Sequence, residues 1–232
     1  MTLVITTFVT FFFYIYFYNR AKSNEKKCNY IHHHWFEKNS NTGDLIIIRY
    51  ASFKATLVDI FSGYPYNHVG MVYKDCIDNK CYILEATAYS GTDYKGVSKV
   101  PINFWFSMHR GCNIYWMRYQ GTKINSTTLD NIYQKHHGKG LNSNPVLWLK
   151  TLKSEKNEKN NKEIKLKDQD KFMCLEFIFY MLQELNVISK KYTADSYTPG
   201  ELINGHIEWN EPYPYKPSLK IYWKNKRLKY IK

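Results

Sequence analysis

Apolar residues occur as short runs in the first half of the chain, and residues typical of turns separate these runs. Runs of about four to eight residues rich in Ile, Val and Tyr, bounded by Gly, Asp and Asn, predict buried strands. Residues 53–61 carry apolar positions at the spacing of a short helix. The first half is therefore predicted to be a small β-meander. Its expected strands lie at 42–50, 67–73, 80–88, 96–102 and 113–119.

The second half carries helical periodicity instead. Residues 127–140 predict a helix up to Gly138, and residues 153–171 are a polar insertion rich in Lys, Asn and Glu. Residues 168–188 predict a buried helix that Asp168 or Asp170 can cap. A buried helix needs a partner, so the expected fold class is α+β, a β-sheet with a helix packed on one face. The apolar stripe of this helix comprises Cys174, Ile178, Met181 and Leu185, widened by Phe172, Leu175, Phe179 and Leu182.

The first residues predict a membrane segment. Residues 2–18 contain no charged side chain, and about 17 residues at helical rise span roughly 25 Å, the short end of a bilayer crossing. An uncleaved anchor over residues 1–19 is favoured over a signal peptide, because no small-residue cleavage site follows the run. The basic residues that follow put the body of a single-pass membrane protein on the cytosolic side. Residues 20–41 are polar, lack periodicity and predict a stalk.

Composition adds a size and a charge to this picture. A chain of 232 residues with 44% hydrophobic content fits one domain, expected over residues 42–210 and followed by a basic tail at 211–232. The formal net charge of +13 is compatible with a biased genome, but it also favours an anionic partner, here an anionic membrane surface. The sequence contains no zinc-finger, RNP or phosphate-loop pattern, so no specific nucleic acid is expected as a partner.

Neither a metal nor a cofactor is expected. The five cysteines form no CxxC pair and predict free thiols in a reducing compartment. His32, His33 and His34 are adjacent, but on a flexible segment adjacent histidines do not converge on one ion. A solvated loop is the favoured interpretation of that triplet.

Cys174 is the candidate nucleophile. It is expected about one turn into the predicted helix, where the partial positive charge of the helix N-terminus favours thiolate over thiol. A histidine beside it would act as general base and then as general acid. His68, at the start of an apolar strand, can supply that ring only if the fold brings the two segments together. The alternative is that Cys174 is a small buried hydrophobe and His68 a core histidine.

The order of several segments resembles the circularly permuted branch of the NlpC/P60 (papain-like) superfamily. The resemblance extends to bacterial YiiX/YebB-like members, related poxvirus proteins and lecithin:retinol acyltransferase-like enzymes. It implies an antiparallel sheet or barrel packed against the helix that bears the cysteine. It also implies a triad with Cys174 as nucleophile, His68 as base and Glu85 orienting the ring, although Glu85 could instead pair with a lysine. The matching segments are "TGDLI" (42–46), "NHVG" (67–70), "ILEA" (83–86), "MCLEFIFYML" (173–182) and "SYTPGELI" (196–203).

The expected function is that of a thiol hydrolase or acyltransferase that works through an acyl-cysteine intermediate on an amide or ester. The anchor and the basic flanks rank a lipid or lipid-modified substrate above a soluble peptide. Backbone N–H groups around Cys174 are expected to form the oxyanion hole, and Asp44 is expected to hold the turn before the first strand. The alternative is a catalytically inactive, membrane-tethered scaffold or binding protein, for example a viral one. Tyr66 and the aromatic residues at 104–106 either line a groove beside the cysteine or belong to the core.

Overall fold

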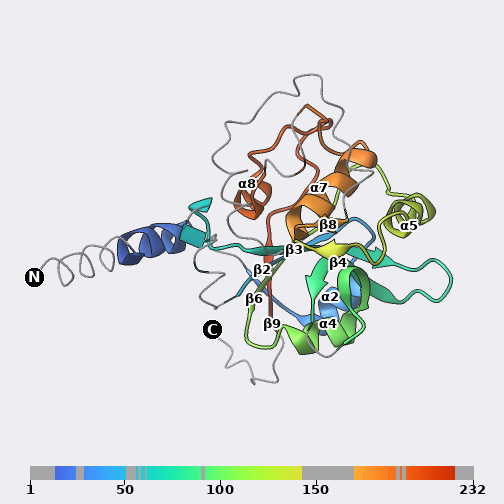
Figure 1. Ribbon diagram of the computed structural model, residues 1–232, viewed down its shortest axis with the longest axis horizontal. Helices are drawn as coiled ribbons and strands as arrows, with labels where there is room; N and C mark the ends of the chain where they lie inside the picture. The colour runs from blue at the N-terminus through green and yellow to red at the C-terminus, as the bar shows by residue number, and fades with distance from the viewer. Residues whose placement is uncertain are drawn as a thin grey trace, which may run out of the picture.

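A seven-stranded sheet in the order β1-β9-β6-β2-β3-β4-β5 organises the computed structural model (Figure 1). Neighbouring strands are antiparallel except β1 and β9, which are parallel. The strands are β1 (Tyr30–His32), β2 (Leu45–Arg49), β3 (His68–Lys74), β4 (Cys81–Ala88), β5 (Lys95–Pro101), β6 (Asn113–Met117) and β9 (Leu219–Tyr222). The structure describes residues 14–24, 29–50, 56, 59–60, 62–89, 92–142, 170–191, 194 and 197–222.

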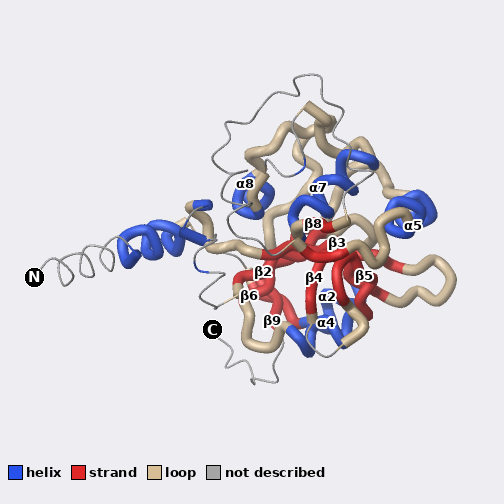
Figure 2. Tube along the Cα trace, in the orientation of Figure 1, coloured by secondary structure: helices blue, strands red, loops and turns tan. Residues whose placement is uncertain are grey.

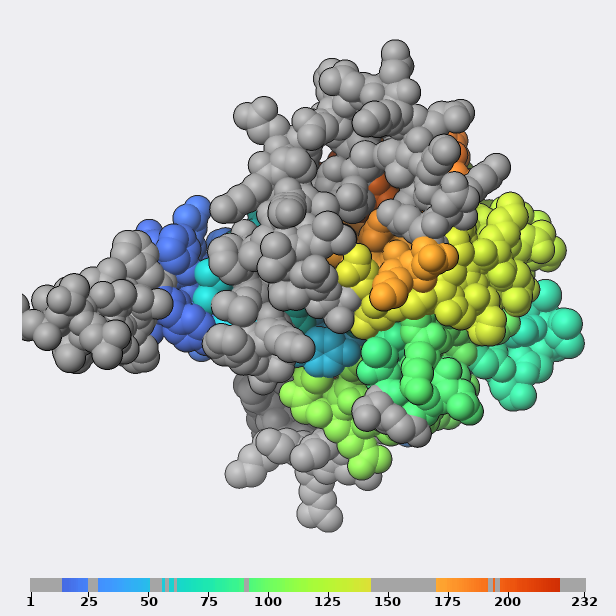
Figure 3. All heavy atoms as spheres, in the orientation of Figure 1, coloured from blue at the N-terminus to red at the C-terminus, as the bar shows by residue number. Residues whose placement is uncertain are grey.

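Helices cover both faces of this sheet (Figure 2). Helix α7 packs on β3 and β4 from one face, whereas α2 and α4 lie against the other. A second, two-stranded sheet pairs β7 (Gly140–Leu141) with β8 (Lys171–Phe172). In the space-filling view, the segment that ends in β7 (yellow) and the segment that begins near β8 (orange) meet at the surface (Figure 3). The helices are α2 (His33–Asn39), α4 (Ile102–Met108), α5 (Ser126–Gln134), α7 (Cys174–Glu184) and α8 (Pro199–Asn204).

Two hydrophobic clusters, one on each face of the sheet, explain why the strands are apolar without alternation. Leu45 and Ile47 of β2 belong to the cluster beneath α7, while Ile46 and Ile48 belong to the cluster beneath α2 and α4. All four are fully buried. Because side chains alternate between the faces of a strand, a strand covered on both sides is apolar at every position.

The predicted α+β class agrees with the mixed architecture and its mostly antiparallel sheet. The sheet is open, with β1 and β5 at its edges. One helix-covered face was expected and two are found, because the sequence pattern did not indicate α2 or α4. In α4, Ile102, Trp105 and Phe106 are buried at helical spacing, so the aromatic residues at 104–106 contribute to the core. Tyr66, which is fully buried under α7, belongs to the core as well.

The membrane anchor expected over residues 1–19 requires a correction. Among the residues that the structure describes, none of the helices has the length and apolar character needed to cross a bilayer. Residues 1–13 lie outside the described residues, and residues 14–23 form a helix whose second half carries charged side chains. This helix is tied to the domain, since Arg49 Nη2 donates to Tyr18 Oη at 3.5 Å and Asn24 Nδ2 donates to the Gly63 carbonyl at 2.7 Å. The single-pass membrane topology, with the domain on the cytosolic side, is therefore not supported.

The predicted stalk and basic tail both contribute strands to the sheet. Tyr30 of β1 pairs with Lys220 of β9, and Ile221 of β9 pairs with Ile114 of β6. Phe36 of α2, within the expected stalk, is fully buried. The domain thus extends well beyond the expected limits of 42–210. Most of the insertion expected at 153–171 lies outside the described residues, and its last position, Lys171, begins β8.

Candidate active site

Cys174 is the first residue of α7, a turn earlier in the helix than the sequence predicts. Met173 is the N-cap, in an extended conformation at φ −73° and ψ 153°. Neither Asp168, which lies outside the described residues, nor Asp170 fills that position. The Glu176 carboxylate accepts a hydrogen bond from the Met173 N–H at 3.1 Å and so fixes the first turn. The first N–H groups of a helix have no acceptor within it, so those of Cys174 and Leu175 are available to an incoming group.

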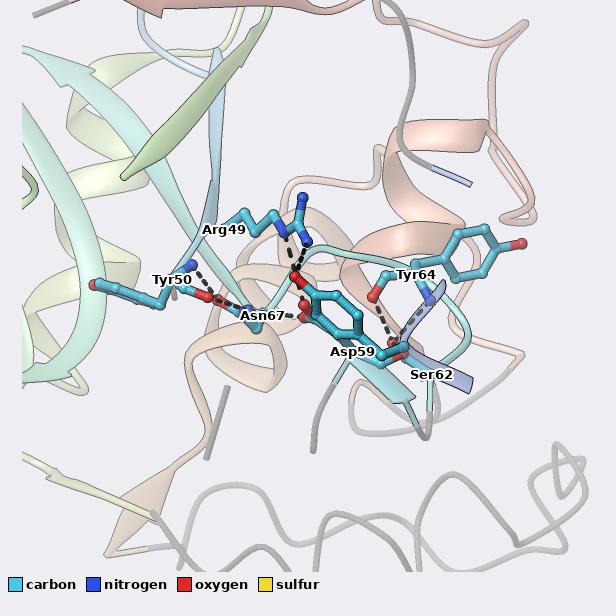
Figure 4. A network of polar contacts seen from close by, with 7 residues as sticks. Arg49, Tyr50, Asp59, Ser62, Tyr64 and Asn67 are labelled. Carbon is cyan, nitrogen blue, oxygen red and sulfur yellow. Dashed lines mark hydrogen bonds and ion pairs between the residues drawn. The ribbon is translucent and has the colours of Figure 1, made fainter. Parts of the chain in front are cut away.

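His68 is the first residue of β3, and the residue before it is firmly held (Figure 4). Asn67 Oδ1 accepts a hydrogen bond from the Tyr50 N–H at 2.9 Å, and Asn67 Nδ2 donates to Asp59 Oδ1 at 2.8 Å. The other Asp59 carboxylate oxygen lies 3.8 Å from Arg49 Nε. These contacts join the end of β2 to the start of β3, so they fix the backbone position from which the His68 side chain extends.

Glu85, on the neighbouring strand β4, bonds directly to His68. Its Oε2 lies 2.6 Å from His68 Nε2, and Glu85 is fully buried. Gly70 allows β3 and β4 to pack closely beside this pair, because a Cβ at that position would lie only 2.6 Å from Ile83 Cγ2. The run "HVGMV" therefore combines a titratable ring with a glycine that the packing of Ile83 requires.

The fold brings together all three residues singled out in the sequence. The Cys174 thiol lies near enough to the His68 ring to raise the pKa of that ring, and Nδ1 is the ring nitrogen left for the sulfur because Nε2 bonds to Glu85. Cys174 is a free, partly exposed thiol, whereas His68 and Glu85 are buried. A thiol, an imidazole and a carboxylate are thus grouped at the start of a helix, with Cys174 the most exposed of the three residues.

The charges of this group support one another. Burial alone would lower the pKa of His68, but the contacts with Cys174 and then Glu85 outweigh it and raise that pKa to about 10. Burial alone would raise the pKa of Glu85, but the hydrogen bond and charge of His68 hold it below its usual value. Near neutral pH, His68 is therefore an imidazolium between a carboxylate and a sulfur.

The site has a second layer that the sequence did not reveal: Tyr89, His109 and Tyr50. The Tyr89 hydroxyl donates to Glu85 Oε1 at 2.5 Å and lies 2.7 Å from His109 Nε2. The Tyr50 hydroxyl lies 2.9 Å from His109 Nδ1. Tyr89 and His109 are both buried, so the polar chain runs inward from Cys174 through the core beneath α4.

The directions of these hydrogen bonds follow from the carboxylate at their centre. An ionised Glu85 can only accept hydrogen bonds, so the Tyr89 hydroxyl donates its one hydrogen to Glu85. The same hydroxyl must then accept a hydrogen bond from His109 Nε2–H. Burial lowers the pKa of His109 to about 4, so this ring is neutral and its Nδ1 accepts from the Tyr50 hydroxyl. Every member then has one consistent role. Because His68 is an imidazolium that donates Nε2–H to Glu85, its Nδ1–H is the proton left for the sulfur.

Strand periodicity contained a signal for part of this layer. Tyr89 is four residues after Glu85, and even spacing along a strand keeps two side chains on one face. His109 carried no comparable signal, because α4 was not expected and the ring reaches the site only through that helix. Asp44, in turn, holds the start of β2 by accepting from Asn41 N–H at 2.9 Å, Tyr119 N–H at 2.8 Å and Trp116 Nε1–H at 2.8 Å.

Comparison with known proteins yields a likeness among solved structures but none among sequence families. The sequence matches no family model, and no curated protein is significantly similar to it. Among solved structures, the chain is similar to the metalloprotein YiiX from Escherichia coli O157:H7 (DUF1105). The TM-score is 0.45 and the sequence identity 16%, over 78% of this chain and 88% of that chain. Nothing about the chemistry of the site follows from a likeness this distant.

Proposed function

We propose that the protein is a thiol hydrolase or acyltransferase with Cys174 as nucleophile. The observation that carries the proposal is the buried His68 ring, hydrogen-bonded to Glu85 and near enough to Cys174, at the start of α7, for the sulfur to raise the pKa of the ring. If His68 were only a core histidine, its bond to Glu85 would satisfy the ring, and a partly exposed cysteine beside it would serve no structural purpose. A nucleophile, a base and an orienting carboxylate are the parts that covalent acyl transfer requires.

The first half-reaction forms an acyl-cysteine. The Cys174 thiolate attacks a carbonyl carbon, the C–S bond forms, and the carbonyl electron pair moves to oxygen. Backbone N–H groups at the start of α7 stabilise that oxyanion. As the tetrahedral intermediate collapses, the bond to the leaving nitrogen, oxygen or sulfur breaks and the leaving atom takes the proton of His68 Nδ1.

The second half-reaction releases the acyl group. Neutral His68 removes a proton from water or from an acceptor hydroxyl, amine or thiol, which attacks the acyl-cysteine. The sulfur leaves as thiolate, and the imidazolium is restored. Glu85 accepts a hydrogen bond from His68 Nε2 throughout, so the ring presents the same nitrogen in both halves. Tyr89 donates a hydrogen bond to the other Glu85 oxygen, and His109 in turn bonds to the Tyr89 hydroxyl.

The proposed substrate is an acyl group on nitrogen, oxygen or sulfur, in a lipid or a peptide. The ranking of lipid above peptide depended partly on the membrane anchor and loses that support. The segments of sequence that resemble the permuted NlpC/P60 branch, including the lecithin:retinol acyltransferase-like enzymes, add to the proposal because those proteins use a cysteine at the head of a helix after a histidine strand.

Active-site labelling tests the proposal without knowledge of the substrate. An acyl-type electrophilic probe should label Cys174 in the parent, as resolved by peptide mass spectrometry, and Cys174→Ala and Cys174→Ser should abolish this label. Cys76→Ser, which removes an exposed thiol on the β3–β4 turn, should leave it unchanged. His68→Gln should slow labelling by about 10²- to 10⁴-fold, the usual contribution of a positioned base. Labelling of Cys174 no faster than of Cys76 would contradict the proposal and favour a scaffold that lacks activity.

A further inference from the structure

Three imidazole rings converge where β1 meets α2, away from the Cys174 group. His32 ends β1 and is the N-cap of α2, in an extended conformation, while His33 and His34 open the helix. The change from strand to helix turns the three rings toward one another. Their centroids lie 4.3 Å (His32–His33), 4.0 Å (His33–His34) and 5.0 Å (His32–His34) apart. One nitrogen of each ring can be chosen so that all three lie within 4.8 Å of one another.

The backbone beneath these rings is fixed, contrary to the solvated loop that the sequence predicts. His32 pairs with Tyr222 in the parallel β1–β9 ladder. One turn into α2, Phe36 is fully buried and meets the Trp116 ring edge-on at 5.1 Å. The His33 ring packs edge-on against Phe106 at 5.9 Å. Ligands on a rigid frame lose little conformational freedom when an ion binds.

A carboxylate supports the cluster from behind. Glu37 Oε2 lies 3.6 Å from His34 Nδ1. Metal-binding histidines commonly turn one ring N–H toward a carboxylate, which fixes the tautomer and leaves the other nitrogen for the metal. Glu37 also lines a cavity of about 270 Å³ together with Lys80, Cys81 and Tyr82. The His34 side chain is 73% exposed, so an ion from solvent can reach the rings.

We propose that His32, His33 and His34 bind a divalent transition-metal ion, with zinc as the best fit, and that Glu37 orients His34. Three neutral imidazoles and one open position form a familiar zinc ligand set. Zinc–nitrogen bonds of about 2.0–2.1 Å place tetrahedral ligand atoms about 3.4 Å apart, so ring rotations must close the present separation by about 1.4 Å at most.

Two features oppose binding, and both are small. His32 Nδ1 accepts from the His34 backbone N–H at 3.4 Å, and ligation through Nε2 would require this long hydrogen bond to be given up. The positive end of α2 disfavours a cation by at most about fivefold in affinity, and Glu37 offsets part of this effect.

Zinc titration of the full chain tests the proposal. Cys174→Ala is used as the background throughout, because a thiolate beside His68 could itself bind zinc. Isothermal titration with zinc chloride should give one site. His33→Ala/His34→Ala should weaken binding at least about tenfold, and Glu37→Gln should weaken it by about tenfold as well. The matched control is His137→Ala/His206→Ala, which removes two exposed histidines elsewhere and should leave the affinity unchanged.

A cobalt titration supplies a second readout. Co²⁺ in place of zinc should give the strong visible absorption of a four-coordinate site, and His33→Ala/His34→Ala should remove it. The proposal is overturned if the Cys174→Ala protein binds no zinc, or if the His33/His34 and His137/His206 variants bind it equally. Because the background lacks Cys174, neither result bears on the proposed acyl transfer.

Discussion

Tyr89→Phe removes one hydroxyl from the centre of the buried polar chain, and its effect can be worked out from the structure. The hydroxyl donates to Glu85 Oε1 at 2.5 Å and accepts from His109 Nε2 at 2.7 Å. Its loss leaves a carboxylate oxygen and an imidazole N–H buried without that partner. A hydrogen bond to a charged group contributes about 1.5–3 kcal/mol, and a neutral one contributes about 1 kcal/mol. We therefore expect the free energy of unfolding to fall by about 3 kcal/mol.

Equilibrium unfolding in urea, followed by tryptophan fluorescence, measures this change. For a protein of this size, about 3 kcal/mol corresponds to a decrease in Tm of roughly 6–12 °C. Tyr16→Phe is the matched control, because Tyr16 is 63% exposed. We expect that variant to lie within about 0.5 kcal/mol of the parent.

A double-mutant cycle with His109→Phe tests whether the chain is connected as described. If Tyr89 and His109 share a hydrogen bond, the double variant should lose less stability than the two single variants combined, by about 0.5–3 kcal/mol. Strict additivity, or a Tyr89→Phe protein as stable as the parent, would refute the assigned network. Unaltered labelling of Cys174 in Tyr89→Phe would in addition show that Glu85 orients His68 without the hydrogen bond from Tyr89.

Two further predictions concern histidine protonation. The ring resonances of His68 in NMR spectra should titrate near pH 10, and Cys174→Ala should lower this pKa because the sulfur is the largest cause of the increase; a His68 that titrates near 6.5 would contradict the ion pair. His136 is buried between the Phe172 and Tyr180 rings, and burial lowers its pKa to about 4. An unfolded histidine titrates near 6.5, so the unfolded chain binds more protons below that pH and the free energy of unfolding should decline as the pH falls from about 6.5 to 4. His136→Phe should flatten this decline in acid-range urea titrations, and an unchanged slope would show that this ring is not shielded.

The meander was predictable because it depends on local pattern, whereas the triad was expected only from the resemblance to the permuted NlpC/P60 branch. The apolar runs at 42–50, 67–73 and 80–88 contain β2, β3 and β4 and lie next to one another in the sheet as expected. The helix bearing Cys174 was found from its apolar stripe, but its start was misplaced. Residues 171–172 pair as a strand with β7, and this tertiary contact overrides the helical pattern before Cys174.

The remaining elements depend on partners that sequence pattern does not reveal. The polar segment at 20–41 contains β1 and α2, which are ordered because β9 and Phe36 provide ladder bonds and burial. His109 enters the site only through α4, whose short aromatic run gave little periodicity. In each case, the information lies in a contact between segments distant in sequence, where local propensity is a weak guide.

The position of β9 has a consequence for how the chain must be made. This strand lies between β1 and β6 and pairs with both, yet it follows both of them in the sequence. Until β9 has been synthesised, the sheet offers β1 no neighbouring strand and the edge of β6 stays open. A sheet that depends on such non-local pairing folds slowly, and in the meantime the unpaired edge strand is prone to aggregation. A premature stop after residue 210 should yield aggregated chains, even though every member of the Cys174 group has already been synthesised.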